Sequence, residues 1–349
     1  MPELRQDPIT LRWVTIATER AKRPTAFTRT AKAAVAPSAE CPFDEGHESM
    51  TPPETMAYRA PGTAPNTPGW EFRVVPNLYP AFGPADAAPE VKVVGPYTTM
   101  RGSGVHEVLI DSPDHYRDIA DFDVAKVDQI IRGYLDRYQA AASNPFVQYV
   151  LLIINHGREA GASLEHPHSQ LFGIPLVPEA VAEELRGVAR FQREHGSCPY
   201  CRMLTYEREA GERLIFENDS FLVFAPFASR TPFESWIVPG WHSARFEALA
   251  DGQRRSFAEA LHVLLARLKR GLNDPPYNFY IHTAPAREAA EEYHWHAELL
   301  PKLAIAAGFE LGTGIMINVA TPESAAEFLR GVDEHAAPAQ AAAGAASHA

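Results

Sequence analysis

The feature of the sequence that constrains the fold most is an internal repeat. Two stretches carry the same landmarks in the same order: a Cys-Pro-aromatic unit (41–43 and 198–200), a strand-like segment ending in histidine, an amphipathic helix, a buried strand and a His-x-His segment. The later halves are nearly in register, because His294 follows His166 by 128 positions. Composition does not determine the order of such landmarks, so we infer a tandem duplication.

The repeat predicts an α+β fold of two similar units, each an antiparallel sheet flanked by one main helix. Apolar residues recur at helical spacing over 127–138 and 257–268, which places those helices. The stretch 31–69, rich in Ala, Pro and Thr, is typical of an irregular loop. The 349 residues suffice for two cores. We therefore predict domains over residues 1–185 and 186–335, followed by a disordered alanine-rich tail over 336–349.

The charge balance excludes some classes of partner. Thirty-two Lys and Arg against 44 Asp and Glu give a net charge of −12, so no general positive field favours nucleic acid or an anionic membrane. No apolar run reaches the length of a membrane span, and the first residues lack the apolar core of a signal peptide. We expect a cytoplasmic protein with neither nucleic-acid nor membrane partners, in which local groups hold any anionic ligand.

Cysteine, histidine and aspartate fall into two sets of four that match the repeat. The second unit offers a Cys-x-x-Cys pair and two later histidines, a set suited to tetrahedral zinc. In the first unit an aspartate replaces one sulfur; this harder ligand either holds zinc more weakly or leaves the site empty, and His47 is an alternative ligand. The predicted ligands are Cys41, Asp44, His115 and His166 in the first unit, and Cys198, Cys201, His242 and His294 in the second.

Four protein ligands leave no open coordination position, so we expect two structural zinc ions per chain and a catalyst elsewhere. The alternative interpretation is a set of buried thiols and polar histidines without metal.

A reactive centre is predicted at the His-Pro-His-Ser-Gln segment 166–170. Alternate residues of an extended segment share a face, which groups His166, His168 and Gln170. A single histidine is more often structural, but this clustering favours a nucleophilic histidine that attacks phosphorus. The preceding loop offers backbone and hydroxyl donors for an anion at Gly157, Gly161 and Ser163.

With Asn155 eleven residues before His166, this segment resembles the active-site signature of the galactose-1-phosphate uridylyltransferases, the transferase branch of the histidine-triad superfamily. The resemblance covers about residues 8 to 330. It includes the DPIT…RAKRP segment from Asp7 to Pro24, PNLYPAF at 76–82, SPDH at 112–115 and GFELGTG at 308–314. The family fold implied is a pair of histidine-triad-like domains, with catalysis in the first.

The resemblance implies a role for each matching residue. His168 would attack the α-phosphorus of a nucleotide sugar, and a sugar 1-phosphate would leave and later be replaced by another in a ping-pong exchange. Gln170 would hold phosphoryl oxygens without acting as an acid, and His166 would bind the first metal. The implied substrate-binding residues are Arg20 and Arg23 for phosphate, Asn77 and Asn155 near the nucleotide, Gly157, Gly161 and Ser163 in the phosphate loop, and Phe309 and Glu310 for the hexose. The family also implies a homodimer that shares site residues between subunits.

Two departures from the family pattern bear on the substrate. The second cysteine–histidine set resembles the subgroup that contains ADP-glucose phosphorylases, and Met316 stands where uridylyltransferases have a hexose-binding glutamine. The metal set of those enzymes would fall here on Glu184, His282, His296 and Glu298, which we rank below the cysteine set. We put uridylyl exchange between UDP-glucose and galactose 1-phosphate first, an adenylyl-transferring ADP-sugar phosphorylase second, and a hydrolase or a silent zinc-braced nucleotide-binding protein below both.

Overall fold

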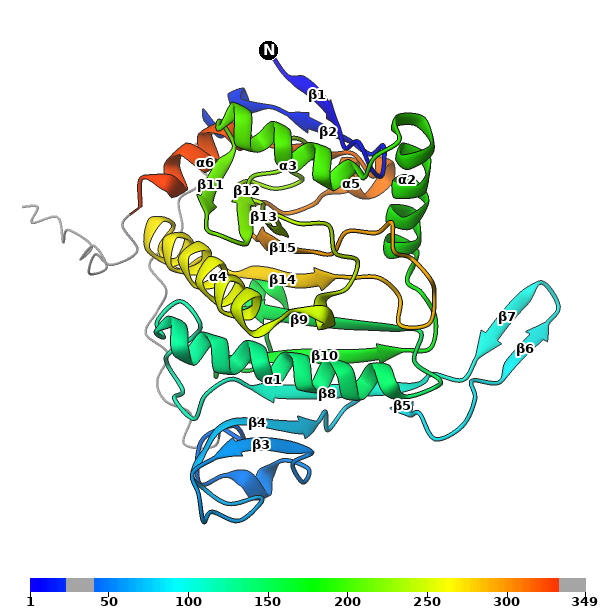
Figure 1. The fold of residues 1–349 in the computed structure, drawn as a ribbon, viewed down its shortest axis with the longest axis vertical. Coiled ribbons are helices and arrows are strands. Elements are labelled where there is room, and N and C mark those ends of the chain that lie inside the picture. Colours follow the sequence, from blue (N-terminus) through cyan, green and yellow to red (C-terminus); the bar gives the residue numbers. More distant parts are fainter. Residues whose placement is uncertain (23–40, 333–349) are drawn as a thin grey trace, which may run out of the picture.

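The computed structural model describes residues 1–22 and 41–332, and most of them pack around one eleven-stranded sheet (Figure 1). Its strands run antiparallel to their neighbours, except for short β5 (Gly83–Pro84), which pairs parallel with β8. The strands in sheet order are β11 Leu214–Glu217, β12 Phe221–Phe224, β13 Ser235–Pro239, β15 His296–Pro301, β14 Tyr277–His282, β9 Tyr149–His156, β10 His168–Ile174, β8 Ser103–Ile110, β4 Trp70–Pro76 and β3 Met56–Arg59.

The strand order confirms the duplication and the α+β class. From the central pair β9 and β14, the order outward is β10, β8, β4, β3 on one side and β15, β13, β12, β11 on the other. The two units are therefore joined edge to edge, with Asn155 of β9 opposite Asn278 of β14. The boundary expected after residue 185 falls within a helix, α2 Glu179–His195, and the tail expected over 336–349 lies outside the described residues.

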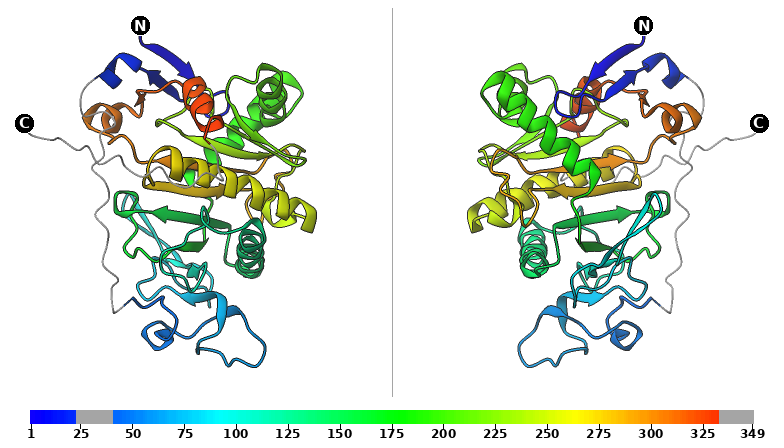
Figure 2. Two further views of the ribbon diagram at one scale, coloured as in Figure 1. Left: turned by 90° about the vertical axis from the view of Figure 1, so that its left-hand side faces the viewer. Right: turned by 90° about the vertical axis from the view of Figure 1, so that its right-hand side faces the viewer.

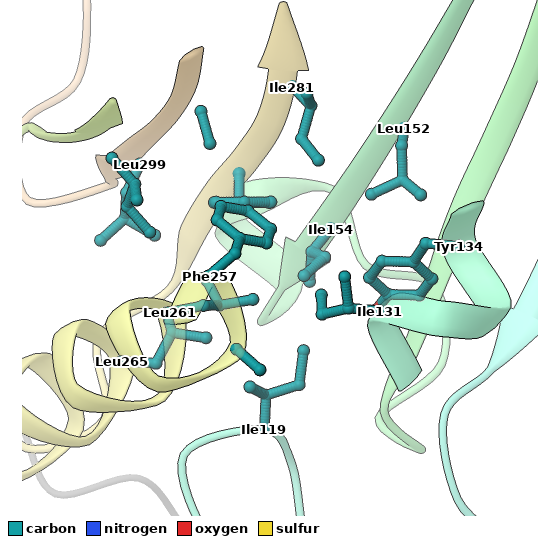
Figure 3. Close-up of a cluster of buried hydrophobic side chains, with 14 of the residues drawn as sticks. Ile119, Ile131, Tyr134, Leu152, Ile154, Phe257, Leu261, Leu265, Ile281 and Leu299 are labelled. Carbon is teal, nitrogen blue, oxygen red and sulfur yellow. The ribbon is translucent and has the colours of Figure 1, made fainter. Parts of the chain in front are cut away.

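Helices α1 (Val124–Ser143) and α4 (Asp251–Gly271) lie side by side on one face of the sheet (Figures 1 and 2). The Asp123 carboxylate accepts a hydrogen bond from the Lys126 amide at the start of α1, and the helix ends before Pro145. Both helices were predicted from their apolar spacing. Their buried faces meet the sheet in one core that spans both units, as Ile131, Leu152, Phe257 and Leu299 show in Figure 3.

Smaller elements surround this body. A three-stranded sheet pairs β1 (Glu3–Gln6) and β2 (Trp13–Ile16), near the start of the chain, with β16 (Met316–Asn318). The hairpin of β6 (Val91–Val94) and β7 (Tyr97–Met100) projects from the main body near β5 (Figure 1). The remaining helices are α3 Pro199–Ala210, α5 Gly308–Thr313 and α6 Pro322–Arg330. Among the described helices, none is both long enough and apolar enough to cross a membrane.

The prediction of an irregular loop over 31–69 was wrong in part. Within the described part of that stretch, Met56–Arg59 form β3, which pairs antiparallel with β4. The Tyr58 ring packs against Phe72 at 5.5 Å, and the Glu54 carboxylate binds Arg59. Pairing with a buried neighbouring strand thus outweighs a local composition that favours turns.

Candidate active site

His168 is the first residue of β10, held between β8 and β9. Its Nδ1 lies 2.8 Å from the carbonyl oxygen of His166. A carbonyl only accepts, so Nδ1 carries the hydrogen and Nε2 keeps a free lone pair. Burial lowers the pKa of His168, and the edge of Phe43 packs on its ring at 5.2 Å. The site therefore presents a neutral imidazole with an unprotonated Nε2.

A cavity of about 420 Å³ lies beside His168. Four of the predicted site residues line it: Asn155, Gly157, His166 and His168. Ser163, Gly161 and Gln170 are not among its lining residues, although Gln170 shares the His168 face of β10 by strand alternation.

The glycine loop is shaped by its backbone. Gly157 has a φ of +80°, and a Cβ there would lie 2.8 Å from the Pro276 side chain, so both conformation and space require glycine. The loop is tied to the second unit, because the Asn278 amide donates to Asn155 Oδ1 at 2.7 Å and to the Ala160 carbonyl at 2.8 Å. The loop beside the cavity is thus held by β14 as well as by β9.

Sequence reasoning missed a charged group in the same cavity. His156 Nε2 lies 2.7 Å from Asp274 Oδ1, and Lys269 Nζ lies 3.1 Å from Asp118 Oδ2. Asp118, His156 and Asp274 line the cavity, while Lys269 reaches Asp118 from the end of α4. The second unit supplies two of these groups. The signal available was the position of His156 directly after Asn155.

Asp111 contacts Ser169 of β10, and burial raises the pKa of Asp111 to about 7. It accepts hydrogen bonds from Tyr134 at 3.0 Å and Ser169 at 3.1 Å. Between about pH 4 and 7 the native protein keeps this proton while the unfolded chain loses it. The free energy of unfolding therefore falls as pH rises through this window, by about 4 kcal/mol from this group.

Asp111→Asn keeps the shape of the side chain and one acceptor. We expect this variant to lack the Asp111 contribution to the decrease in the free energy of unfolding with rising pH. The test is denaturant unfolding of both proteins at several values between pH 4.5 and 7.5. Parallel stability curves for the variant and the wild type would show that Asp111 is ionised in the native state across this range.

The first predicted metal set is assembled. Asp44 Oδ1 lies 2.7 Å from His115 Nδ1 and 2.9 Å from His166 Nδ1. His166 Nε2 lies 2.8 Å from the Ser112 carbonyl and donates to it, so the Nδ1 lone pair faces the carboxylate. Two acceptors this close need a cation or a proton between them. Cys41 completes the set, while His47 Nδ1 instead bonds the Cys41 carbonyl at 2.8 Å, so the structure groups Asp44 rather than His47 with the other donors.

The second set is built in the same way at the start of α3. Cys201 Sγ lies 3.6 Å from Nδ1 of both His242 and His294. The Nε2 atoms of these histidines donate to the Glu291 and Pro239 carbonyls, at 2.8 and 3.0 Å, which leaves both Nδ1 lone pairs facing sulfur. A hydrogen bond from Cys198 lowers the pKa of Cys201 and favours its thiolate. This donor set fits zinc.

The alternative metal set is also brought together, but one of its carboxylates is already paired with a cation of the protein itself. Glu184, His282, His296 and Glu298 place their ligand atoms close to one another. Arg230 forms ion pairs there with Glu298 and, at 2.6 Å, with Glu234. The guanidinium already offsets the charge of Glu298, whereas the Cys198 set has no such partner among its described contacts.

The remaining predicted residues lie elsewhere or are not described. Asn77 Nδ2 lies 3.2 Å from His106 Nε2, and His106 in turn contacts Gln170. Arg20 is exposed in a short 3-10 helix, and Arg23 lies outside the described residues. Phe309 and Glu310 belong to α5, and Glu310 lines a different cavity of about 510 Å³.

Comparison with known proteins identifies the family. Residues 1–178 match the family model described as galactose-1-phosphate uridyl transferase, N-terminal domain. The chain belongs to this family. Residues 104–334 of this transferase-family member also match a domain of unknown function, DUF4921. An ADP-glucose phosphorylase of Arabidopsis thaliana is 37% identical over 95% of this chain and 93% of its own length. A galactose-1-phosphate uridylyltransferase of Thermotoga maritima is 28% identical over 95% and 98%.

Solved structures of the same two kinds of enzyme are also similar to this chain. The crystal structure of an Arabidopsis thaliana ADP-glucose phosphorylase with bound ADP-glucose superposes with a TM-score of 0.80 at 35% identity, covering 95% of this chain and all of that one. A uridylyltransferase structure superposes with a TM-score of 0.73 at 29% identity, over 95% and 98%. Both cover nearly the whole chain, so the predicted fold and family are confirmed.

Proposed function

We propose that this transferase-family member moves a nucleotidyl group from a nucleoside diphosphate hexose to a phosphate acceptor through a covalent nucleotidyl-His168. The observation that carries the proposal is the His168 tautomer. Its Nδ1–H donates to the His166 carbonyl at 2.8 Å, which leaves Nε2 unprotonated beside a cavity. No base is needed to activate such a nucleophile.

The chemistry balances without a general acid. Nε2 attacks the α-phosphorus, the bond from that phosphorus to the bridging oxygen breaks, and hexose 1-phosphate leaves with the electron pair. The imidazole then carries a positive charge, which the Nδ1–H bond to the His166 carbonyl stabilises. An oxygen of the acceptor phosphate attacks the same phosphorus and regenerates neutral His168. Because the leaving group is a phosphate, an amide at Gln170 suffices where an acid would otherwise be needed.

The two metal sets would hold zinc as structural ions. When bound, zinc would supply a positive centre that holds together the Cys41 set and, at the start of α3, the Cys198 set. His166 belongs to the first set and also provides the carbonyl that orients His168. His166 would thus both bind the metal and orient His168.

For the substrate we place phosphorolysis of ADP-glucose first: His168 takes the adenylyl group, glucose 1-phosphate leaves, and inorganic phosphate accepts the adenylyl group to give ADP. The Arabidopsis phosphorylase supports this, at 37% identity against 28% for the Thermotoga uridylyltransferase. Sequence reasoning alone ranked uridylyl exchange first. That exchange remains the second candidate, which the match of residues 1–178 to the uridyl transferase model supports.

Side-by-side turnover tests the order of the candidates. We expect kcat/KM for ADP-glucose with phosphate to exceed that for UDP-glucose with galactose 1-phosphate by roughly tenfold or more, the range set by one discriminating contact or a few. Faster reaction of UDP-glucose would reverse the order. Steady release of nucleoside monophosphate without an acceptor would indicate a hydrolase, and tight ADP binding without any turnover would indicate a silent binding protein.

A homodimer that completes the hexose site is part of the proposal. Glu310 lines a cavity other than that of His168, and its neighbours Phe309 and Leu311 are exposed. Exposed apolar side chains on a short helix suit contact with a second copy. Light scattering with size-exclusion chromatography gives the assembly mass directly; a monomer at assay concentration would exclude sharing of these residues between subunits.

A further inference from the structure

Among the described residues, the Gln170 side-chain amide has one hydrogen-bond partner. Gln170 lies within β10, opposite Val108 of β8 and Ile153 of β9, so its backbone is fixed from both sides. Its Oε1 lies 2.9 Å from His106 Nε2. Its amide nitrogen has no hydrogen-bond partner among the residues that the structure describes. The orientation of this amide therefore depends on whether Nε2 of His106 is a hydrogen-bond donor or an acceptor.

The tautomer of His106 follows from its other contact. The Ala81 backbone N–H points to His106 Nδ1 at 3.0 Å, and a backbone N–H can only donate. Nδ1 is therefore the acceptor, and Nε2 carries the hydrogen. Burial lowers the pKa of His106, which favours this neutral form.

Only Gln170 can accept that hydrogen within this group. Asn77 Nδ2 is 3.2 Å from His106 Nε2, but the Asn77 oxygen already accepts from the Tyr79 N–H at 2.8 Å, so the Asn77 end that faces His106 is a donor. The Gln170 oxygen is thus committed to His106, and its NH₂ group remains available.

The imidazole of His106 is held firmly enough to impose this choice. His106 stands opposite Phe172 across the β8–β10 pair, and their rings stack with centroids 4.1 Å apart. The His106 carbonyl accepts from the Asn77 N–H at 2.9 Å. Stacking and backbone pairing together fix the ring on the face of the sheet that carries Gln170 and His168.

We propose that His106 is a positioning residue that orients the Gln170 amide with its NH₂ group toward the phosphoryl oxygens of the nucleotide. This inference rests on the proposed nucleotidyl transfer. Two donor hydrogens would face an anion that becomes more negative as Nε2 of His168 attacks. If the amide turned over, its carbonyl oxygen would face the same anion and repel it. Sequence reasoning missed His106, which lies in the strand opposite the catalytic segment.

Two substitutions separate orientation from packing. His106→Phe keeps a ring to stack on Phe172 but has no donor for Gln170, while His106→Gln retains an N–H near the position of Nε2. In single-turnover assays we expect His106→Phe to form the nucleotidyl-protein about tenfold more slowly, below the 10²–10³ cost of losing a donor outright. We expect KM to change little and His106→Gln to recover most of the rate.

The outcomes distinguish failure of the positioning role from failure of the proposed nucleotidyl transfer. If the wild type forms a nucleotidyl-protein and His106→Phe forms it at the same rate, the positioning role is overturned while the function stands. Equal slowing in both variants would also overturn it, because packing would then explain the loss. If the wild type forms no adduct, the proposed function fails and the positioning role fails with it.

The tautomer can be tested without any substrate. In ¹⁵N-histidine-labelled protein, the signal lost in His106→Gln identifies the ring, and its nitrogen shifts report which atom is protonated. We expect protonation at Nε2. Protonation at Nδ1 would overturn the proposal whatever the activity assays show.

Discussion

His168→Ala is expected to abolish nucleotidyl transfer, lowering kcat by roughly 10⁴-fold or more, because removal of a covalent nucleophile leaves only binding and electrostatic contributions. The fold should persist, since among the described residues the imidazole of His168 makes one hydrogen bond and one ring contact. Steady-state rates with ADP-glucose and with UDP-glucose measure the effect, and thermal unfolding checks the fold.

A matched histidine substitution controls for general damage. His195 lies exposed at the end of α2, outside the cavity beside His168, so His195→Ala is expected to keep the wild-type rate. If His168→Ala retained more than about one hundredth of the activity, direct attack by the acceptor would replace the covalent route.

The second large effect is expected at the cysteine–histidine set of the second unit. Replacing both Cys198 and Cys201 by serine should remove one metal ion per chain and lower the free energy of unfolding by at least about 3 kcal/mol. The set ties the start of α3 to His242 and to His294, and His294 lies next to the fully buried Trp295. Without a cation, two histidine lone pairs would face sulfur in a buried site.

Metal content by mass spectrometry and denaturant unfolding check this expectation together. Cys41→Ser is the matched variant in the first unit, and Asp44→Cys should increase metal retention there by restoring a second thiolate. Wild-type protein without bound metal, and with the same stability as the double variant, would favour the alternative of unmetallated thiols.

The sequence predicted features that form within each unit. Apolar spacing located α1 and α4, and the ordered landmarks brought all eight predicted metal ligands into their two sets. The alternation of an extended segment likewise placed Gln170 on the His168 face. These features are local, or are set by a repeat that the chain carries twice.

Contacts between the units escaped prediction for a physical reason. The pairing of β9 with β14 and the approach of Lys269 to Asp118 depend on which strand edges meet, and no spacing along the chain encodes that choice. Strand β3 and the role of His106 were not predicted, because the pairing of β3 depends on β4 and the contacts of His106 depend on β10. Ser163 shows the reverse case, a residue that local pattern favoured but that does not line the cavity.

The central claim is that His168 carries the nucleotidyl group between substrates. Intact-mass spectrometry of the protein mixed with ADP-glucose or UDP-glucose, without an acceptor, tests it most directly. We predict a mass increase of one nucleoside monophosphate group, adenylyl before uridylyl, which inorganic phosphate or a sugar 1-phosphate removes and which His168→Ala does not form. No mass increase with any nucleotide sugar, or the same increase in His168→Ala, would contradict the claim.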